Sequence, residues 1–185
     1  MANHITPIHP PLKNHLGRLA WTISLLCLPL MVGCQQPEQP RRTVTQEDLI
    51  EANRNLVGRD ANAIKAYLAE HKLRYTETQT GLWYSISDQG VGNYAKKGQV
   101  ITLKYTVTLL DGTPCYSSKK TGPKKFLIGQ GGVESGLEEA VLMLRKKAKA
   151  KFILPPHLAY GLIGDNDQVP ARATLIYDVE VVDLE

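Results

Sequence analysis

The sequence contains few cysteines and histidines, and neither residue type is arranged as a disulfide framework or a metal site. Cys27 and Cys34 lie in or beside an N-terminal apolar run, so Cys115 is the single thiol of the body and cannot form an internal disulfide. After that run the only histidines are His71 and His157. A Ser-His-Asp triad or a zinc cluster therefore has little support.

A strong excess of charge of one sign is also absent. Lys13 and Arg18 are the only charged side chains before position 34, so the rest of the chain has 20 of the 22 basic residues against 18 acidic ones. A formal charge of +2 is too close to neutral for a committed nucleic-acid binder. The lysines between positions 146 and 151 alternate with apolar residues, which predicts that most of them lie on the solvated face of one strand.

Phosphate-binding motifs are missing as well. The run Gly129-Gln130-Gly131-Gly132 precedes a predicted helix, but the third glycine of a dinucleotide fingerprint would stand where Glu134 is, and no Gly-Lys-Ser/Thr ending follows. Ser135 lacks the Gly-x-Ser-x-Gly turn of a hydrolase nucleophile. We therefore expect neither a cofactor nor a metal.

An uncharged apolar stretch is present at residues 19–32, after the basic Lys13 and Arg18. It is shorter than the ~20 residues of a membrane-spanning helix and has the length of a signal-peptide core. It ends in Met31-Val32-Gly33-Cys34, which resembles a lipobox, where a signal peptidase cuts and the cysteine becomes the lipidated first residue; Met31 departs from the usual Leu. The alternatives are a plain signal peptide with an incidental cysteine, or an uncleaved anchor.

We therefore divide the chain into a signal peptide (1–33), a Gln/Pro-rich tether (34–44), a helical extension (45–78) and a main domain (79–185). The extension is predicted to contain two short helices. One begins at a capping sequence around Thr45, and the other at Arg59-Asp60, with Asp60 as its cap. They are expected to form a packed or dimerising appendage.

The main domain has a hydrophobic period of two. Apolar and polar residues alternate over 101–109, 148–154 and 175–181, each of which predicts a strand with one buried face, and Asp111-Gly112 predicts a turn. A single internal helix is predicted over residues 136–144. These elements predict an α+β fold in which a curved antiparallel sheet wraps over one short helix.

A series of short motifs then suggests a family. They occur in the order Lys104-Tyr105-Thr106, Asp111-Gly112, Tyr116-Ser117-Ser118, Phe126-Leu127-Ile128-Gly129, Gly136-Leu137-Glu138-Glu139-Ala140, Pro155-Pro156-His157-Leu158-Ala159-Tyr160-Gly161, Val169-Pro170 and Leu175-Ile176-Tyr177-Asp178-Val179-Glu180. This order resembles the FKBP-type peptidyl-prolyl cis-trans isomerases over residues 98–185. Thr80-Gly81-Leu82-Trp83-Tyr84 is similar to the first strand of bacterial members with an N-terminal helical extension. The lipobox and the helical lead-in are most similar to the lipoprotein isomerases associated with gliding motility.

The resemblance implies an enzyme without a nucleophile, whose pocket binds proline. Tyr105 and Phe126 would form the walls of this pocket, Leu137 its floor, and Val169 and Tyr177 its far side. Val133 and the backbone N–H of Glu134 would hold the substrate. Tyr160 would supply a hydroxyl at the rim, and Tyr116 would lie beside Tyr105. Plain core packing is the alternative role for Phe126, Val133 and Leu137.

Three positions depart from the family. Cys115-Tyr116 stands where Phe-Asp is usual, Leu137 stands where many members have Trp, and Glu134 replaces an apolar residue. Adjacent strand residues face opposite ways, so Tyr116 takes the place of the missing Phe only if a one-residue bulge shifts it. The sequence leaves both geometries open.

The resulting expectation is a lipid-anchored isomerase and folding helper for envelope proteins. It would face the periplasm, and the outer membrane is expected rather than the inner. It would bind proline-containing protein segments and would be held at the membrane through lipidated Cys34. No binding of nucleic acid is expected. The alternative is a non-catalytic proline-peptide-binding or chaperone-like module on the same fold. The client proteins and the oligomeric state are left open.

Overall fold

The computed structural model describes residues 43–185, so the predicted signal peptide and Cys34 lie outside the described residues. In chain order the elements are α1 (Gln46–Glu70), β1 (Thr76–Glu77), β2 (Trp83–Asp88), β3 (Val91–Tyr94), β4 (Val100–Leu109), β5 (Pro114–Ser117), α2 (Ser118–Thr121), β6 (Lys124–Leu127), α3 (Ser135–Val141), β7 (Arg145–Lys146), β8 (Lys149–Leu154), the 3-10 turn η1 (Pro156–Leu158) and β9 (Leu175–Leu184). None of the helices in this part of the chain is long and apolar enough to cross a membrane.

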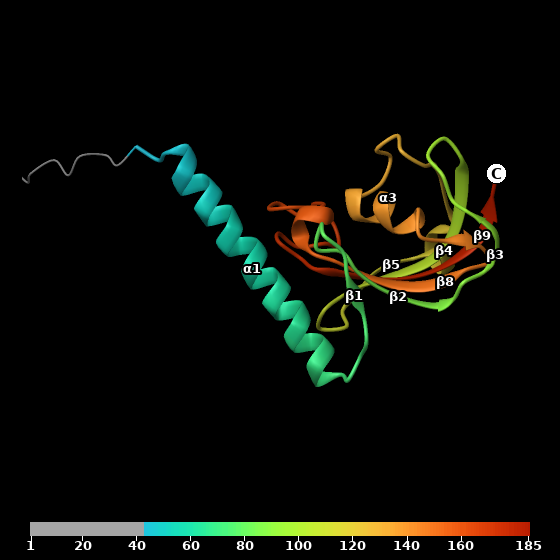
Figure 1. Cartoon of the computed structure of the whole chain (residues 1–185), viewed down its shortest axis with the longest axis horizontal. Helices are drawn as coiled ribbons and strands as arrows, with labels where there is room; N and C mark the ends of the chain where they lie inside the picture. The colour runs from blue at the N-terminus through green and yellow to red at the C-terminus, as the bar shows by residue number, and fades with distance from the viewer. Residues whose placement is uncertain (1–42) are drawn as a thin grey trace, which may run out of the picture. The chain divides into compact units, whose positions relative to one another are not determined.

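The main sheet is antiparallel and confirms the predicted α+β fold. Its strand order is β1-β2-β8-β9-β4-β5, β6 pairs with the other part of β4, and β3 and β7 form a separate two-stranded ribbon. Figure 1 shows α3 lying over the curved sheet. The alternation in β4 turns Ile101, Leu103 and Val107 into the core that α3 covers. The long β4–β9 pairing thus provides the platform on which the candidate site is built.

The helix α3 is shorter than predicted. It ends at Val141 rather than at residue 144, and turns carry the chain on to Leu144, which is still fully buried. Its close approach to β8 depends on Gly136, because a Cβ there would lie 2.8 Å from the Leu154 Cγ. The prediction of a single internal helix also missed the four-residue α2 and the turn η1.

The prediction of two helices in the extension was wrong, because α1 is one continuous helix of 25 residues. The predicted capping start is confirmed: the Thr45 side chain accepts from the Asp48 N–H, and the Asp48 side chain accepts from the Thr45 N–H. Asp60 lies inside the helix and does not cap it. Nothing crowds Gly58, and a single interior glycine costs about 1 kcal/mol, too little to end a helix that packing continues to stabilise.

The second half of α1 packs on the outer face of the sheet. Ile64 and Leu68 are buried against Trp83 and Ile153, two residues that pair across β2 and β8. An ion pair adds to this contact, since Arg172 Nη2 donates to Asp60 Oδ1 at 2.8 Å. The extension is therefore packed against the domain.

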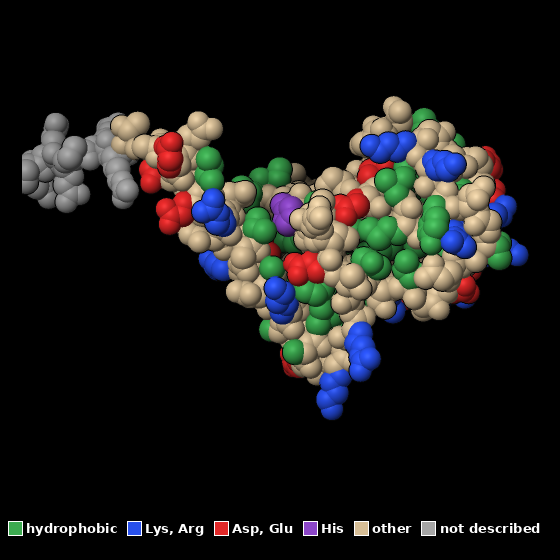
Figure 2. Space-filling view, in the orientation of Figure 1, with side chains coloured by type: hydrophobic (Ala, Val, Ile, Leu, Met, Phe, Trp, Pro, Cys, Tyr) green, Lys and Arg blue, Asp and Glu red, His purple; other side chains and the backbone are tan. Residues whose placement is uncertain are grey.

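The lysines near β8 do not gather into a basic patch. Lys149 and Lys151 are exposed on β8, as predicted, and Lys151 pairs with Asp178. Lys147 lies in a turn with φ +69°. On the face shown in Figure 2, Lys and Arg side chains are scattered among acidic and apolar ones.

Candidate active site

The residues predicted for the pocket come together around α3. Tyr105, Leu137, Val169 and Tyr177 are buried members of one hydrophobic cluster, and the remaining apolar candidates pack against it at partial exposure: Tyr116, Phe126, Val133 and Tyr160. Glu134 joins them through a hydrogen bond from Tyr177. Residues from four strands, one helix and the loop after η1 thus converge on one place.

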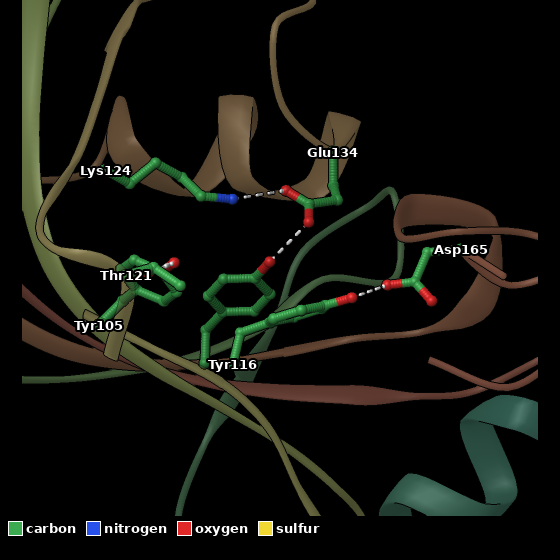
Figure 3. Close-up of polar contacts among 7 residues, drawn as sticks. Tyr105, Tyr116, Thr121, Lys124, Glu134 and Asp165 are labelled. Atoms are coloured by element: carbon green, nitrogen blue, oxygen red, sulfur yellow. Dashed lines mark hydrogen bonds and ion pairs between the residues drawn. The ribbon is translucent and has the colours of Figure 1, made fainter. Parts of the chain in front are cut away.

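Tyr105 is fixed by hydrogen bonds at its backbone N–H and at its side-chain hydroxyl. On β4 it lies opposite Val179 of β9, and its N–H donates to the Ser118 Oγ at 3.0 Å. Its hydroxyl is hydrogen-bonded to the Thr121 Oγ1 at 2.9 Å (Figure 3). The Tyr-Ser-Ser motif and the short α2 that follows it therefore position this aromatic wall.

A β-bulge decides the geometry of Cys115-Tyr116. Val107 pairs with Tyr116, and the next β4 residue, Thr108, pairs with Pro114, so Cys115 is the extra residue. Tyr116 therefore shares the face of Val107, which is buried in the core. Cys115 is buried too, and this burial raises the pKa of its thiol. Of the two geometries that the sequence left open, the chain adopts the bulge.

Tyr116 is anchored to the loop after η1. Its hydroxyl donates to Asp165 Oδ2 (Figure 3). The Oδ2 atom of Asp167 lies 3.3 Å from the same hydroxyl. The hydrogen bond to Asp165 and then burial raise the pKa of Tyr116 to about 12. Burial opposes ionisation of Asp165, but the hydrogen bonds from Tyr116 and from the Val169 and Asp167 N–H groups lower its pKa.

The side chain of Glu134 lies in the site, whereas the sequence had implied a role only for its backbone. The residue occupies the N-cap position of α3, where its side chain makes no capping hydrogen bond, and it is 8% exposed. Its Oε1 accepts from the Tyr177 hydroxyl at 2.7 Å, and its Oε2 lies 3.9 Å from Lys124 Nζ, which in turn sits 5.3 Å from the Tyr105 ring centroid (Figure 3). Burial, and then the Glu134 charge, raise the pKa of Tyr177 well above its usual range.

An open groove of about 320 Å³ lies beside this cluster and is lined by Lys124, Gly131, Gly132, Val133, Glu134, Ala159 and Tyr160. Burial raises the pKa of Tyr160 strongly, and the carboxylates of Glu134 and Asp165 raise it further. Tyr160 therefore stands between two acidic side chains at the rim.

Sequence reasoning missed Lys124, Thr121 and Asp165. Thr121 and Lys124 lie between the Tyr-Ser-Ser motif and Phe126 in the sequence, but no periodicity indicates the contact of Thr121 with Tyr105 or that of Lys124 with Glu134. Asp165 and Tyr116 are 49 residues apart, so only the folded loop brings them together.

Comparison with known proteins agrees with this geometry. A family model described as FKBP-type peptidyl-prolyl cis-trans isomerase matches residues 92–182. The peptidyl-prolyl cis-trans isomerase Fkbp12 of Drosophila melanogaster is 43% identical over 93 residues, which cover 50% of this chain and 86% of the relative. The chain belongs to this family of isomerases.

Two further FKBP relatives extend the match toward the N-terminus. The probable isomerase FkpA of Neisseria meningitidis is 37% identical over 130 residues, which cover 66% of this chain and 47% of the relative. The chain thus spans about half the length of that protein. The crystal structure of FkpA from Escherichia coli superposes with a TM-score of 0.61 at 28% identity, covering 75% of this chain and 64% of the other.

Proposed function

We propose that this protein is a peptidyl-prolyl cis-trans isomerase that binds proline-containing protein segments. The observation that supports this proposal is the convergence of Tyr105, Phe126, Leu137 and Tyr177 on one cluster beside the start of α3. In this assignment Leu137 is the floor, Tyr105 and Phe126 are walls, and the Glu134 N–H together with Val133 holds a substrate carbonyl. Tyr160 supplies its hydroxyl from the rim, while Val169, Tyr177 and Tyr116 close the remaining sides.

The physical basis is the electronic structure of the amide. Rotation about the peptide C–N bond has a barrier of about 18–20 kcal/mol because resonance is lost in the twisted state, and X-Pro bonds are the ones with an appreciable cis population. The twisted amide has less charge separation than the planar one. An apolar pocket that excludes water therefore stabilises the transition state more than the ground state, without a nucleophile.

A protease-coupled assay on a proline peptide tests this proposal. We expect the full-length protein, in mild detergent, to accelerate isomerisation above the uncatalysed rate. The alternative is a non-catalytic proline-binding module, which is favoured by the buried Glu134 carboxylate at a position that is apolar in the family. That alternative predicts peptide binding with no acceleration.

We also propose that Cys34 anchors the protein to the cell envelope. The support is the apolar run at residues 19–32, the lipobox-like Met31-Val32-Gly33-Cys34 and the resemblance to the lipoprotein isomerases associated with gliding motility. Several acyl chains on one cysteine give durable attachment, because each buried methylene contributes about 0.8 kcal/mol. The isomerase domain would then face the periplasm, preferentially at the outer membrane, and act on proline segments of envelope proteins.

A further inference from the structure

The carboxylate of Glu134 has an oxygen whose hydrogen bonding is incomplete. The side chain is 3% exposed, and while Oε1 accepts from Tyr177, Oε2 is buried and has no hydrogen-bond partner among the described residues. The nearest cation, Lys124 Nζ, is 3.9 Å away, which is too long for a hydrogen bond. A buried carboxylate is costly unless its oxygens are paired, so this second oxygen calls for a donor.

Lys124 lies near Oε2 of Glu134 without forming a hydrogen bond to it. Its side chain is 27% exposed and reaches over the Tyr105 ring, and both Lys124 and Glu134 line the groove of about 320 Å³. A long, partly solvated lysine at 3.9 Å is a weakly held partner. A cationic group entering along the groove could make the close contact that Lys124 does not.

The Tyr160 side of the groove is negatively charged, as is the Glu134 side. Tyr160 also lines the groove, and burial raises its pKa most, followed by the interaction of its hydroxyl with the Glu134 carboxylate and by the charge of Asp165. Asp167 lies next to Asp165 and within 3.3 Å of the Tyr116 hydroxyl. Three carboxylates thus lie on or near the rim, whereas Lys124 is the one cationic side chain among the described residues that line the groove, and this balance favours a ligand of positive charge.

We propose that this pocket selects proline segments with a Lys or Arg directly next to the proline, whose cationic side chain replaces Lys124 at Glu134 Oε2. The proposal rests on the proposed function, since it assumes that proline occupies the apolar cluster. A charge-assisted hydrogen bond to a carboxylate that is already buried has a large effect because the carboxylate needs no further desolvation. The proposal makes Glu134 a specificity-determining residue through its side chain, in addition to its backbone.

The test compares three matched proline peptides that carry Lys, its neutral isostere norleucine, or Glu on one flank of the proline, with each flank tried in turn. Dissociation constants are measured for the full-length protein in mild detergent at low and high salt. On at least one flank, we expect the Lys peptide to bind about tenfold tighter than the norleucine peptide and the Glu peptide to bind more weakly than either. Added salt should reduce the preference.

Two variants and a control test whether the preference for the Lys peptide depends on Glu134 and Lys124. Glu134→Gln should bring the Lys-to-norleucine ratio close to one, whereas Lys124→Met should raise it, because the competing ammonium is gone. The control Glu180→Gln removes the same charge from β9, on the face opposite the buried Val179, and should keep the wild-type ratio. Thermal unfolding is recorded for each variant, and Lys124→Met gives an independent test if Glu134→Gln does not fold.

The outcomes separate this proposal from the proposed function. The role of Glu134 is overturned if the wild type binds the Lys and norleucine peptides equally. It is also overturned if the preference for Lys survives in folded Glu134→Gln. In either case, isomerisation of the norleucine peptide still supports the isomerase. A Glu134-dependent preference without any isomerisation supports the specificity and contradicts the isomerase. Failure to bind any of the peptides contradicts both.

Discussion

The Tyr177 hydroxyl on β9 and the Glu134 carboxylate at the start of α3 form a buried hydrogen bond of 2.7 Å. Tyr177→Phe should remove this hydrogen bond from the buried carboxylate and lower the free energy of unfolding by about 2 kcal/mol. Glu134→Ile in the same chain should recover most of that loss, because both polar partners are then replaced by apolar groups.

Urea unfolding of the two single variants and the double variant completes a double-mutant cycle. We expect the effects of the two substitutions to be non-additive by more than about 0.5 kcal/mol. Additive effects would show that the hydrogen bond contributes nothing specific to stability.

A second prediction concerns Lys147, whose φ of +69° is a conformation that side chains with a Cβ disfavour. Lys147→Gly should raise the free energy of unfolding by about 0.5–1 kcal/mol, since relief of strain exceeds the entropic cost of glycine. Lys147→Ala is the matched control: it also removes the charge but keeps the Cβ, so its melting temperature should not rise. Equal melting temperatures for the two variants would exclude backbone strain.

The Tyr116–Asp165 pair makes stability depend on pH at both extremes. The pKa of Asp165 is lowered in the fold, so its contribution is present above about pH 4 and is lost as the pH falls through the lowered value. The pKa of Tyr116 is raised to about 12, so its contribution is present below about pH 10 and is lost between there and pH 12.

Tyr116→Phe removes the titration of Tyr116 and the share of the lowered Asp165 pKa that comes from the Tyr116 hydroxyl, while the Val169 and Asp167 N–H donors remain. The stability difference between wild type and Tyr116→Phe should therefore be constant from about pH 5 to 9 and shrink outside that range. Denaturant unfolding across the pH range measures it, and the difference between the ultraviolet tyrosinate titrations of wild type and Tyr116→Phe reports the pKa of Tyr116. A difference that is independent of pH throughout would mean that Tyr116 acts by packing alone.

The anchoring proposal is tested at Cys34. Cys34→Ser should release the protein from membranes, or leave it held by an unprocessed signal segment, because no other apolar run of comparable length follows in the sequence. Membrane fractionation with metabolic acyl labelling measures this. Acyl label on the Cys34→Ser protein would refute lipidation at this residue.

Local patterns were sufficient to predict most of the fold. The alternation of residues 101–109 and 175–181 predicted β4 and β9, and it also placed Tyr105 and Tyr177 on the buried face. The extension was mispredicted because Arg59-Asp60 was interpreted as the start of a second helix, with Asp60 as its cap. Burial of Ile64 against β2 and β8, a tertiary contact, keeps the helix continuous.

The site was predictable only in its apolar part. The bulge at Cys115 depends on register with β4, and the Glu134 side chain turns inward to meet Tyr177, which is 43 residues away in sequence. Both features arise from contacts between distant segments, and neither has a periodic signal in the chain.

The most direct test of the central claim is the rate of cis-to-trans isomerisation of a proline peptide, measured for the wild type, Tyr160→Phe and Tyr116→Asp with thermal unfolding alongside. If the pocket is catalytic, the wild type accelerates the reaction, and Tyr160→Phe loses several-fold of that rate through one hydrogen bond of about 0.5–1.5 kcal/mol. Tyr116→Asp puts a carboxylate on the buried face of β5, next to Asp165 and Asp167, and should be slower. A wild-type rate equal to background while the peptide still binds would contradict the claim and leave a proline-binding module.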